Sequence, residues 1–324
     1  MQTAELIHTC DVLLPVAVEC LGGTFETRIG GVGALLLVPA LDRPRLEDSP
    51  VVAPPPFVVL VGDVDWTNSF HDQLDITTGS PWGQMHSWHP EDRSMGSPDL
   101  QRLGIRFAAE SEELVATYER VVEDLVGWWE SFKEWIEILT AVDVTTHNLG
   151  TIFAPAAAWT RPAEGEPRQA LRHHGPITIS PPADKKRIPR SGLARAASLA
   201  GLEEPGLEWR LIRAARQRLW QRQYRASVLD AGSAAELALT KLIVRSLGDI
   251  SISAKSALID KYRTLGNRGD LFRRLGGEIP DEFWSGLVRP RNLATHEGAQ
   301  LSLQQSEEAE RIASMIVERA TPLP

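Results

Sequence analysis

YRASVLDAGSAAELALTKLIVRSL, residues 224–247, is the stretch that decides the fold of the C-terminal part of this chain. Its apolar residues recur with helical periodicity, and it is rich in alanine. Small side chains allow neighbouring helices to approach closely. The stretch therefore predicts a helix that packs tightly against other helices.

Helical periodicity also dominates the sequence on both sides of this stretch, from about residue 207 to the end. Ser306, which is followed by two glutamates, has the composition of a helix start. Further helices are expected over residues 207–219, 254–265, 271–275, 281–295 and 306–319. Together they predict an all-α helical bundle.

The N-terminal part has short runs typical of β-strands, separated by glycine and proline. Strands are expected over residues 24–29, 33–38, 57–61, 103–107, 152–153 and 177–179. Residues 111–140 instead carry apolar side chains at helical spacing, including Trp128, Trp129 and Trp135. We expect an antiparallel sheet, sandwich or partial barrel, with this long helix packed on it and its tryptophans in the core.

A segment rich in proline, glycine and charge, residues 181–192, has little to bury and predicts an exposed linker. A short helix is expected after it, over residues 194–202. The fold class predicted is α+β with two domains. The predicted parts are a β-rich domain over 1–180 that contains the long helix 111–140, a linker over 181–206, and the helical bundle over 207–324.

The formal net charge of −9 is unevenly distributed. From Leu207 onward the chain holds 18 of its 34 basic and 14 of its 43 acidic residues, a net of +4. The preceding residues hold the other 16 and 29, a net of −13. This asymmetry suggests different partners for the two parts, although charges that only solvate the surface would give the same pattern.

The cysteine content and the length of the apolar segments indicate the cellular location of the protein. Two cysteines, Cys10 and Cys20, are too few for a disulfide framework and form no CxxC pair for zinc. The apolar run 12–18 is too short to cross a bilayer and lacks a preceding basic segment, and no other stretch approaches the required length. We therefore expect a cytoplasmic protein without a membrane segment.

One pattern in the C-terminal part carries chemistry: Arg291 and Asn292, followed by His296. The spacing alone is unspecific, because Arg168 and His173 repeat it. Its context is more informative, since it lies in a late helix that precedes a Glu-rich final helix.

Residues 218–243 resemble the early helices of HEPN domains, and residues 288–310 resemble their motif helix and closing helix. The motif of that family is an arginine and a histidine with four to six residues between them. The resemblance covers residues 207–324. It implies a metal-independent endoribonuclease in a defence or toxin role, which acts on RNA as a homodimer and needs no cofactor. The N-terminal domain would then sense an unknown trigger or restrain the nuclease.

In such an enzyme His296 would act as the general acid and base, because histidine titrates near neutral pH. Arg291 would stabilise the phosphorane through its planar guanidinium, and Asn292 would position His296 or a phosphate oxygen. In an ideal α-helix Arg291 and His296 lie about 140° apart, so two copies across a dimer axis would have to converge on one phosphate. Pro290 either kinks this helix or starts a fresh one, whose free N–H groups would attract phosphate.

Glu236, in the alanine-rich stretch, has two interpretations. The resemblance implies a buried acidic partner that orients His296 or Arg291. Alternatively, Glu236 is a surface residue paired with Lys241 or Thr240. A buried carboxylate would need a partner in either case.

The N-terminal domain offers a weaker candidate site, formed by Trp82, His86, Trp88 and His89 in a stretch with several glycines and prolines. Exposed tryptophans in a loop suit ligand or partner contact. Two histidines and a carboxylate are potential metal ligands, but the spacing of His86 and His89 fits no established zinc pattern. No metal is expected.

Two other functions compete with the nuclease. The first is a non-enzymatic HEPN module that binds nucleotide or a partner and drives dimerisation. The second is a ligand-binding β domain for which the helical bundle is only a dimerisation scaffold. Exposure of Arg291 and His296 near a groove would favour catalysis, whereas burial of both in packing would favour the other two.

Overall fold

The computed structural model describes residues 3–42, 51–53, 82–86, 97–144, 156–161, 170–173 and 186–324. The chain divides into two compact units, Met1–Glu204 and Pro205–Pro324. An antiparallel sheet dominates the first unit and helices form the second, so the architecture is α+β. Among the helices described, none is long and apolar enough to cross a membrane.

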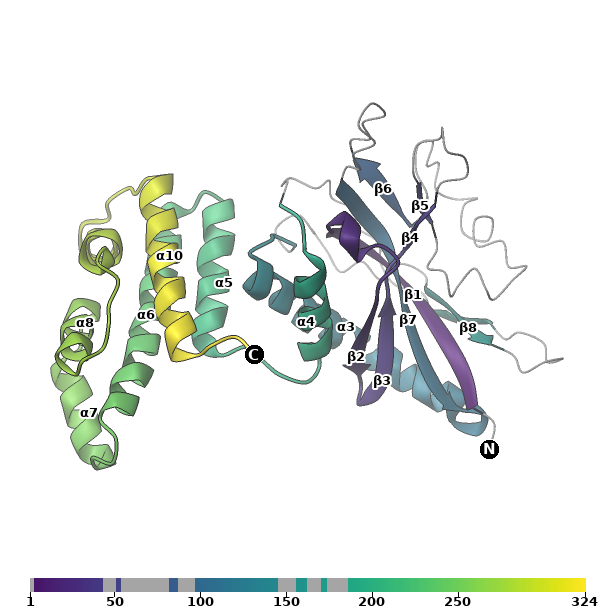
Figure 1. Cartoon of the computed structure of the whole chain (residues 1–324), viewed down its shortest axis with the longest axis horizontal. Helices are drawn as coiled ribbons and strands as arrows, with labels where there is room; N and C mark the ends of the chain where they lie inside the picture. Colours follow the sequence, from purple (N-terminus) through teal and green to yellow (C-terminus); the bar gives the residue numbers. More distant parts are fainter. Residues whose placement is uncertain are drawn as a thin grey trace. The chain divides into compact units, whose positions relative to one another are not determined.

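The sheet of the first unit runs in the order β2-β3-β7-β1-β8-β9, and β6 also pairs with β7 (Figure 1). Its strands are β1 (Thr3–Pro15), β2 (Thr24–Ile29), β3 (Val32–Leu37), β6 (Gly83–His86), β7 (Ser97–Glu110), β8 (Ala156–Arg161) and β9 (Ala170–His173). A separate short pair consists of β4 (Ala40–Asp42) and β5 (Val51–Ala53). The strands expected over 24–29 and 33–38 are confirmed as β2 and β3. Those expected over 57–61, 152–153 and 177–179 lie outside the described residues.

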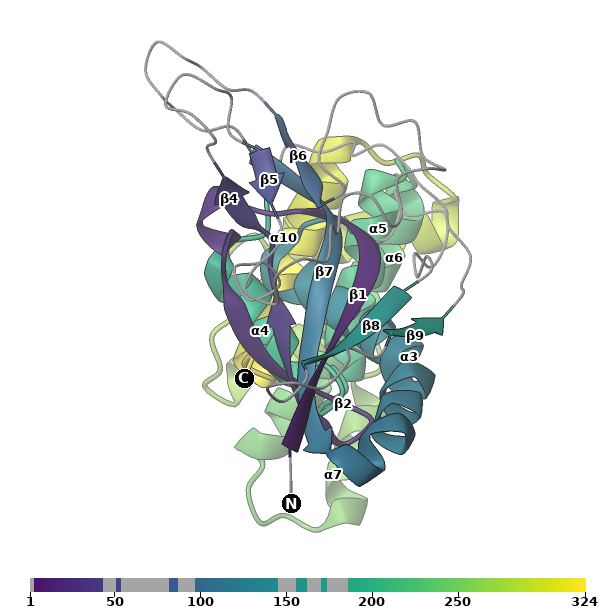
Figure 2. The same cartoon turned by 90° about the vertical axis from the view of Figure 1, so that its right-hand side faces the viewer.

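The long strands β1 and β7 form the spine of this sheet and lie side by side in both views (Figure 2). They pair from Thr3 opposite Glu110 to Pro15 opposite Asp99. The expected strand 103–107 is only the middle of β7, and β1 was not expected. Both faces of β1 are largely buried, so its sequence lacks the alternation by which half-buried strands are found.

One face of the sheet is covered by the predicted long helix. A 3-10 turn (η2, Ser111–Glu113) leads into α3 (Leu114–Thr140), which confirms the helix expected over 111–140. The three tryptophans expected in the core are each at most 4% exposed. The indole Nε1 of Trp128 donates a hydrogen bond of 2.8 Å to Thr27 Oγ1 on β2, which anchors the helix to the sheet.

The prediction of an exposed linker over 181–192 is wrong for the described part of that range, residues 186–192. Ile188 is fully buried and bridges to Val16. After it comes α4 (Arg190–Leu199), which packs on α3 and β2 and buries Leu193 and Ala196 completely. The apolar stripe of α4, which includes Leu193 and Ala196, begins just after this segment, and together with Ile188 it attaches the segment to the first unit.

The second unit contains α5 (Leu207–Trp220), α6 (Tyr224–Ser246), α7 (Ile252–Lys261), α8 (Leu265–Arg274) and α10 (Leu303–Ala320), together with a helical stretch over 283–297. The alanine-rich α6 contacts α5, α8 and α10. Its alanines at 231, 234, 235 and 238 have no exposed surface. The tight helix packing predicted from residues 224–247 is therefore confirmed.

The last helix begins earlier than expected. Ser302 caps α10 and forms a capping box with Gln305, so the helix starts one turn before Ser306. Ser306 is buried instead, and its hydroxyl donates to the backbone carbonyls of Tyr224 and Ser302. The sequence thus predicted the helix correctly but assigned its N-cap to Ser306 instead of Ser302.

Candidate functional site

The helix expected over 281–295 exists, but it is not a regular α-helix. A π-helical turn (η3, Phe283–Val288) leads into a short α-helical segment (α9, Arg289–Asn292), and a second π-helical turn (η4, Leu293–Glu297) follows. Pro290 in its middle has no N–H to donate, which removes one regular hydrogen bond. The backbone uses wider hydrogen bonds nearby, from Arg289 N to Trp284 O and from Gly298 N to Leu293 O.

The two interpretations of Pro290 can now be separated. Val288 has helical dihedral angles, φ −65° and ψ −48°, and Asn292 is helical as well. The chain thus passes through Pro290 as one continuous helix, and a fresh N-terminus with free N–H groups is wrong. The proline instead interrupts the regular hydrogen bonding, as expected of a proline within a helix.

Two motif residues face solvent. Asn292 and His296 are both exposed. Within residues 186–324, which are described throughout, no hydrogen bond or ion pair engages either side chain. Because η4 is π-helical, the rotation per residue that separates Arg291 from His296 in an ideal α-helix does not apply over this segment.

Arg291 lies against α6 rather than in solvent. An added Cβ at Gly232 would come within 2.7 Å of Arg291 Cγ, so this side chain crosses α6 where the helix has no side chain. Its guanidinium Nη2 lies 3.6 Å from Glu236 Oε2, and the Arg291 side chain is 24% exposed. Gly232 therefore creates the space in which Arg291 rests.

Glu236 is paired with arginines rather than with its helix neighbours. Its Oε1 lies 3.1 Å from Arg268 Nη1, and its Oε2 faces Arg291. The surface interpretation of Glu236 is wrong, because Lys241 pairs with Glu208 and the Thr240 hydroxyl donates only to the backbone carbonyl of Glu236. The partnership with Arg291, one of the two that the resemblance implied, is observed, but the Glu236 side chain is 23% exposed instead of buried.

Sequence reasoning missed Arg268, which comes from α8. Besides the ion pair, its guanidinium donates to Thr240 Oγ1 at 2.9 Å and to the backbone carbonyl of Tyr262 at 3.2 Å. These contacts hold it in place while it occupies one oxygen of Glu236. The position of Arg268 in the sequence does not indicate a link with the motif. The packing of α8 on α6 brings Arg268 to Glu236.

Arg225, near the start of α6, was also missed. Its Nε donates a hydrogen bond of 2.9 Å to the backbone carbonyl of Ala294 within η4. The motif helix is thus held on α6 at two points, by Arg225 near one end and by Arg291 over Gly232.

The candidate residues of the first unit fare differently. Trp82 is only 1% exposed and packs with Arg102, whose guanidinium carbon lies 5.5 Å from the indole centroid. An exposed contact role for Trp82 is therefore wrong, because the residue leads into β6 and is covered there. His86 ends β6, and only its backbone is described. Trp88 and His89 lie outside the described residues.

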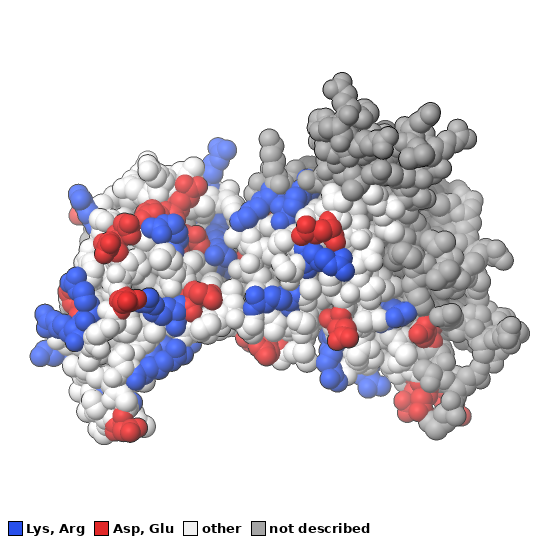
Figure 3. Space-filling model, in the orientation of Figure 1, with Lys and Arg blue, Asp and Glu red and all other residues white. Residues whose placement is uncertain are grey.

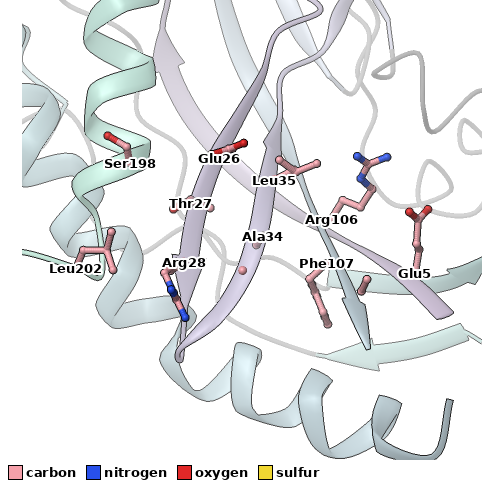
Figure 4. Close-up of a pocket in the computed structure, with 12 residues that line it drawn as sticks. Glu5, Glu26, Thr27, Arg28, Ala34, Leu35, Arg106, Phe107, Ser198 and Leu202 are labelled. Carbon is pink, nitrogen blue, oxygen red and sulfur yellow. The ribbon is translucent and has the colours of Figure 1, made fainter. Parts of the chain in front are cut away.

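A depression of about 550 Å³ lies on the sheet of the first unit (Figure 4). Glu26 pairs with Leu35 in the strand register, and Leu35 pairs with Arg106, so these three side chains share one face. Glu5 and Arg28 lie on the same face. It carries both charges and lies opposite the face that packs on α3, so it could receive a ligand with groups of both signs.

Charge on the second unit is mixed on the face in Figure 3, where basic and acidic side chains alternate instead of forming one basic field. In the described part of the chain, no three His, Cys, Asp or Glu side chains gather as metal ligands would.

Comparison with known proteins gives no family assignment: no family model, curated protein or solved structure matches this chain.

Proposed function

We propose that this protein is a metal-independent endoribonuclease of HEPN type, active as a homodimer through its second unit. The observation that carries the proposal is the pairing of Arg291 with Glu236 across two helices, with Asn292 and His296 left exposed on the same motif helix. A carboxylate that holds the motif arginine is the arrangement the resemblance implied. The exposure of the histidine leaves it accessible to a substrate.

The proposed chemistry uses the RNA itself as the nucleophile. His296 takes the proton of a 2′-hydroxyl, whose oxygen attacks the adjacent phosphorus, and the bond to the 5′-oxygen breaks. The products are a 2′,3′-cyclic phosphate and a free 5′-hydroxyl, because the leaving oxygen takes the proton that His296 accepted. Arg291 donates hydrogen bonds to the non-bridging oxygens as their charge grows.

Arg291 is held loosely enough to take part. Its 3.6 Å separation from Glu236 is longer than the roughly 2.7–2.9 Å of a strong charge-assisted hydrogen bond. Arg268 also neutralises the other oxygen of that carboxylate, which weakens its hold on Arg291. Arg291 can therefore turn from Glu236 to a phosphate at modest cost.

The N-terminal unit is proposed to sense a trigger or restrain the nuclease. Its support is the depression lined by Glu26, Arg28 and Arg106 on the face of the sheet opposite α3. Isothermal titration of candidate small molecules into the protein, compared with an Arg106→Gln variant, tests this role. A trigger that binds both forms equally well would exclude this depression as its site.

The nuclease is tested by single-turnover cleavage of a labelled RNA in EDTA. We expect His296→Ala to slow cleavage by about 10²–10⁴-fold, as for the loss of a general acid or base. Arg291→Lys should also lose activity, because lysine lacks the planar fork. Arg289→Lys, at an exposed position two residues earlier, is the matched control and should cleave normally.

A wild-type rate for His296→Ala would contradict the nuclease. The non-enzymatic module is the alternative, and it is favoured by the partial burial of Arg291, whose side chain is 24% exposed, and by the absence of a hydrogen bond or ion pair between Arg291 and His296 within the described residues 186–324. RNA binding without cleavage by the wild-type protein would support that module. Cleavage that requires added Mg²⁺ or Mn²⁺ would refute the metal-independent mechanism.

A further inference from the structure

A pocket whose charged lining residues are both arginines lies beside the motif helix of the second unit. This surface pocket of about 670 Å³ opens between the turn that joins α5 to α6 and the segment that follows Gly298. None of its lining residues is acidic. They are Arg222, Gln223, Tyr224, Arg225, Ala226, Leu229, Gln300 and Leu301.

Several polar side chains of this pocket are available to a ligand, although Gln223 accepts a hydrogen bond from Arg218. Within residues 186–324, all of them described, no hydrogen bond or ion pair engages the side chain of Arg222 or Gln300. Arg225 uses its Nε on the carbonyl of Ala294, which leaves its terminal nitrogens uncommitted. Two arginines and a glutamine thus line one pocket that has no acidic lining residue to neutralise them.

Arg222 occupies an unusual backbone position. Its φ of +59° is left-handed, a conformation that suits glycine and is costly for a side chain of this size. It lies in the short turn between α5 and α6, where Arg222 N donates to Leu219 O. The turn therefore presents an unpaired guanidinium where a glycine would be easier to accommodate.

The pocket also has apolar lining. Ala226, Leu229 and Leu301 contribute to it, and Tyr224 adds an aromatic residue. Guanidinium groups donate hydrogen bonds to phosphate oxygens, whereas bases stack on aromatic and apolar side chains. A single-stranded nucleotide needs both kinds of surface, while an acidic peptide needs mainly the first.

We infer that this pocket binds single-stranded RNA beside the motif helix, with Arg222 and Arg225 on phosphates and Tyr224 against a base. The inference rests on the proposed nuclease, for which the pocket would be a substrate-binding site. The Arg225–Ala294 hydrogen bond joins the pocket to the motif helix two residues before His296. RNA held in the pocket would therefore lie beside the helix that carries the exposed histidine.

The test measures RNA affinity in the absence of cleavage. A fluorescein-labelled, unstructured RNA of about twelve nucleotides is titrated with the full chain carrying His296→Ala, and anisotropy is followed at several salt concentrations. Each phosphate contact on a single strand contributes about 0.7 to the slope of log affinity against log salt. Added to this background, Arg222→Gln should reduce the slope by about 0.7 and weaken binding about fivefold at 0.1 M salt.

Two further variants make the result specific. Arg245→Gln removes the same charge from α6, about 30 Å along this helix from Arg225, and should leave both affinity and slope unchanged. Tyr224→Leu should weaken binding about fivefold or more while leaving the slope intact, because stacking does not release counterions.

Equal affinity and slope for Arg222→Gln and the His296→Ala parent would overturn the inference. So would an acidic peptide that binds the pocket more tightly than the RNA does. These outcomes are distinct from failure of the nuclease. If wild-type protein cleaves RNA but Arg222→Gln binds normally, only the pocket is wrong. If nothing is cleaved but Arg222→Gln still weakens binding, only the nuclease is wrong.

Discussion

Replacing Gly232 with alanine tests whether the seat of Arg291 on α6 matters for activity. An added Cβ would come within 2.7 Å of Arg291 Cγ, and ordinary carbon contacts need about 3.5–4.0 Å. The Arg291 side chain must therefore shift by about 1 Å, which separates it further from Glu236. Misplacement of about this size can cost about 10²-fold in rate.

The same substitution should leave stability nearly unchanged. Alanine gains about 1 kcal/mol over glycine in a helix interior. Loss of the Arg291–Glu236 ion pair costs about 0.5 kcal/mol, because its two side chains are 24% and 23% exposed and solvent screens them. We expect Gly232→Ala to unfold within about 1 kcal/mol of wild type while cleaving RNA 10- to 100-fold more slowly.

The assay pairs single-turnover cleavage with urea unfolding of the full chain. Gly127→Ala is the control, since Gly127 is an exposed residue of α3 whose added Cβ would meet nothing within 4 Å. It should gain about 1 kcal/mol and cleave normally. A wild-type rate for Gly232→Ala would refute the reasoning, and a loss above about 3 kcal/mol would mean that the two helices cannot adjust.

Three further outcomes are expected. Burial opposes ionisation of Glu208, but hydrogen bonds from Lys241 and Thr321 outweigh it and lower the pKa of Glu208. Glu208→Gln should therefore cost about 2 kcal/mol at pH 7 and progressively less as the pH falls through the glutamate range, and a loss that stays constant with pH would contradict the charged pair. Burial raises the pKa of the Cys20 thiol to about 11, so iodoacetamide at pH 8 should modify it only after urea unfolding, and rapid native modification would contradict this burial. Light scattering of the full chain should give the mass of a dimer at high micromolar concentration, whereas a strict monomer would exclude a composite site formed by two copies.

The sequence determined the elements whose signals are local. Periodicity and alanine content predicted α6, and the apolar stripe over 111–140 predicted α3 with its buried tryptophans. Alternation predicted β2, but it missed β1, because a strand buried on both faces loses that signal. The composition of residues 186–192 also wrongly predicted a linker, since Ile188 is the one large hydrophobic residue among them and its burial leaves no local signal.

For the candidate site, the sequence provided Arg291, Asn292, His296 and Glu236 but not their arrangement. Only the tertiary structure decided that Glu236 lies between two arginines, because Arg268 is brought to it by the packing of α8 on α6. A proline within a helical pattern can either end the helix or interrupt its hydrogen bonding, and the irregular hydrogen bonding around Pro290 shows that the helix continues. Local sequence left that choice open, and packing of the motif helix against α6 accompanies its continuation.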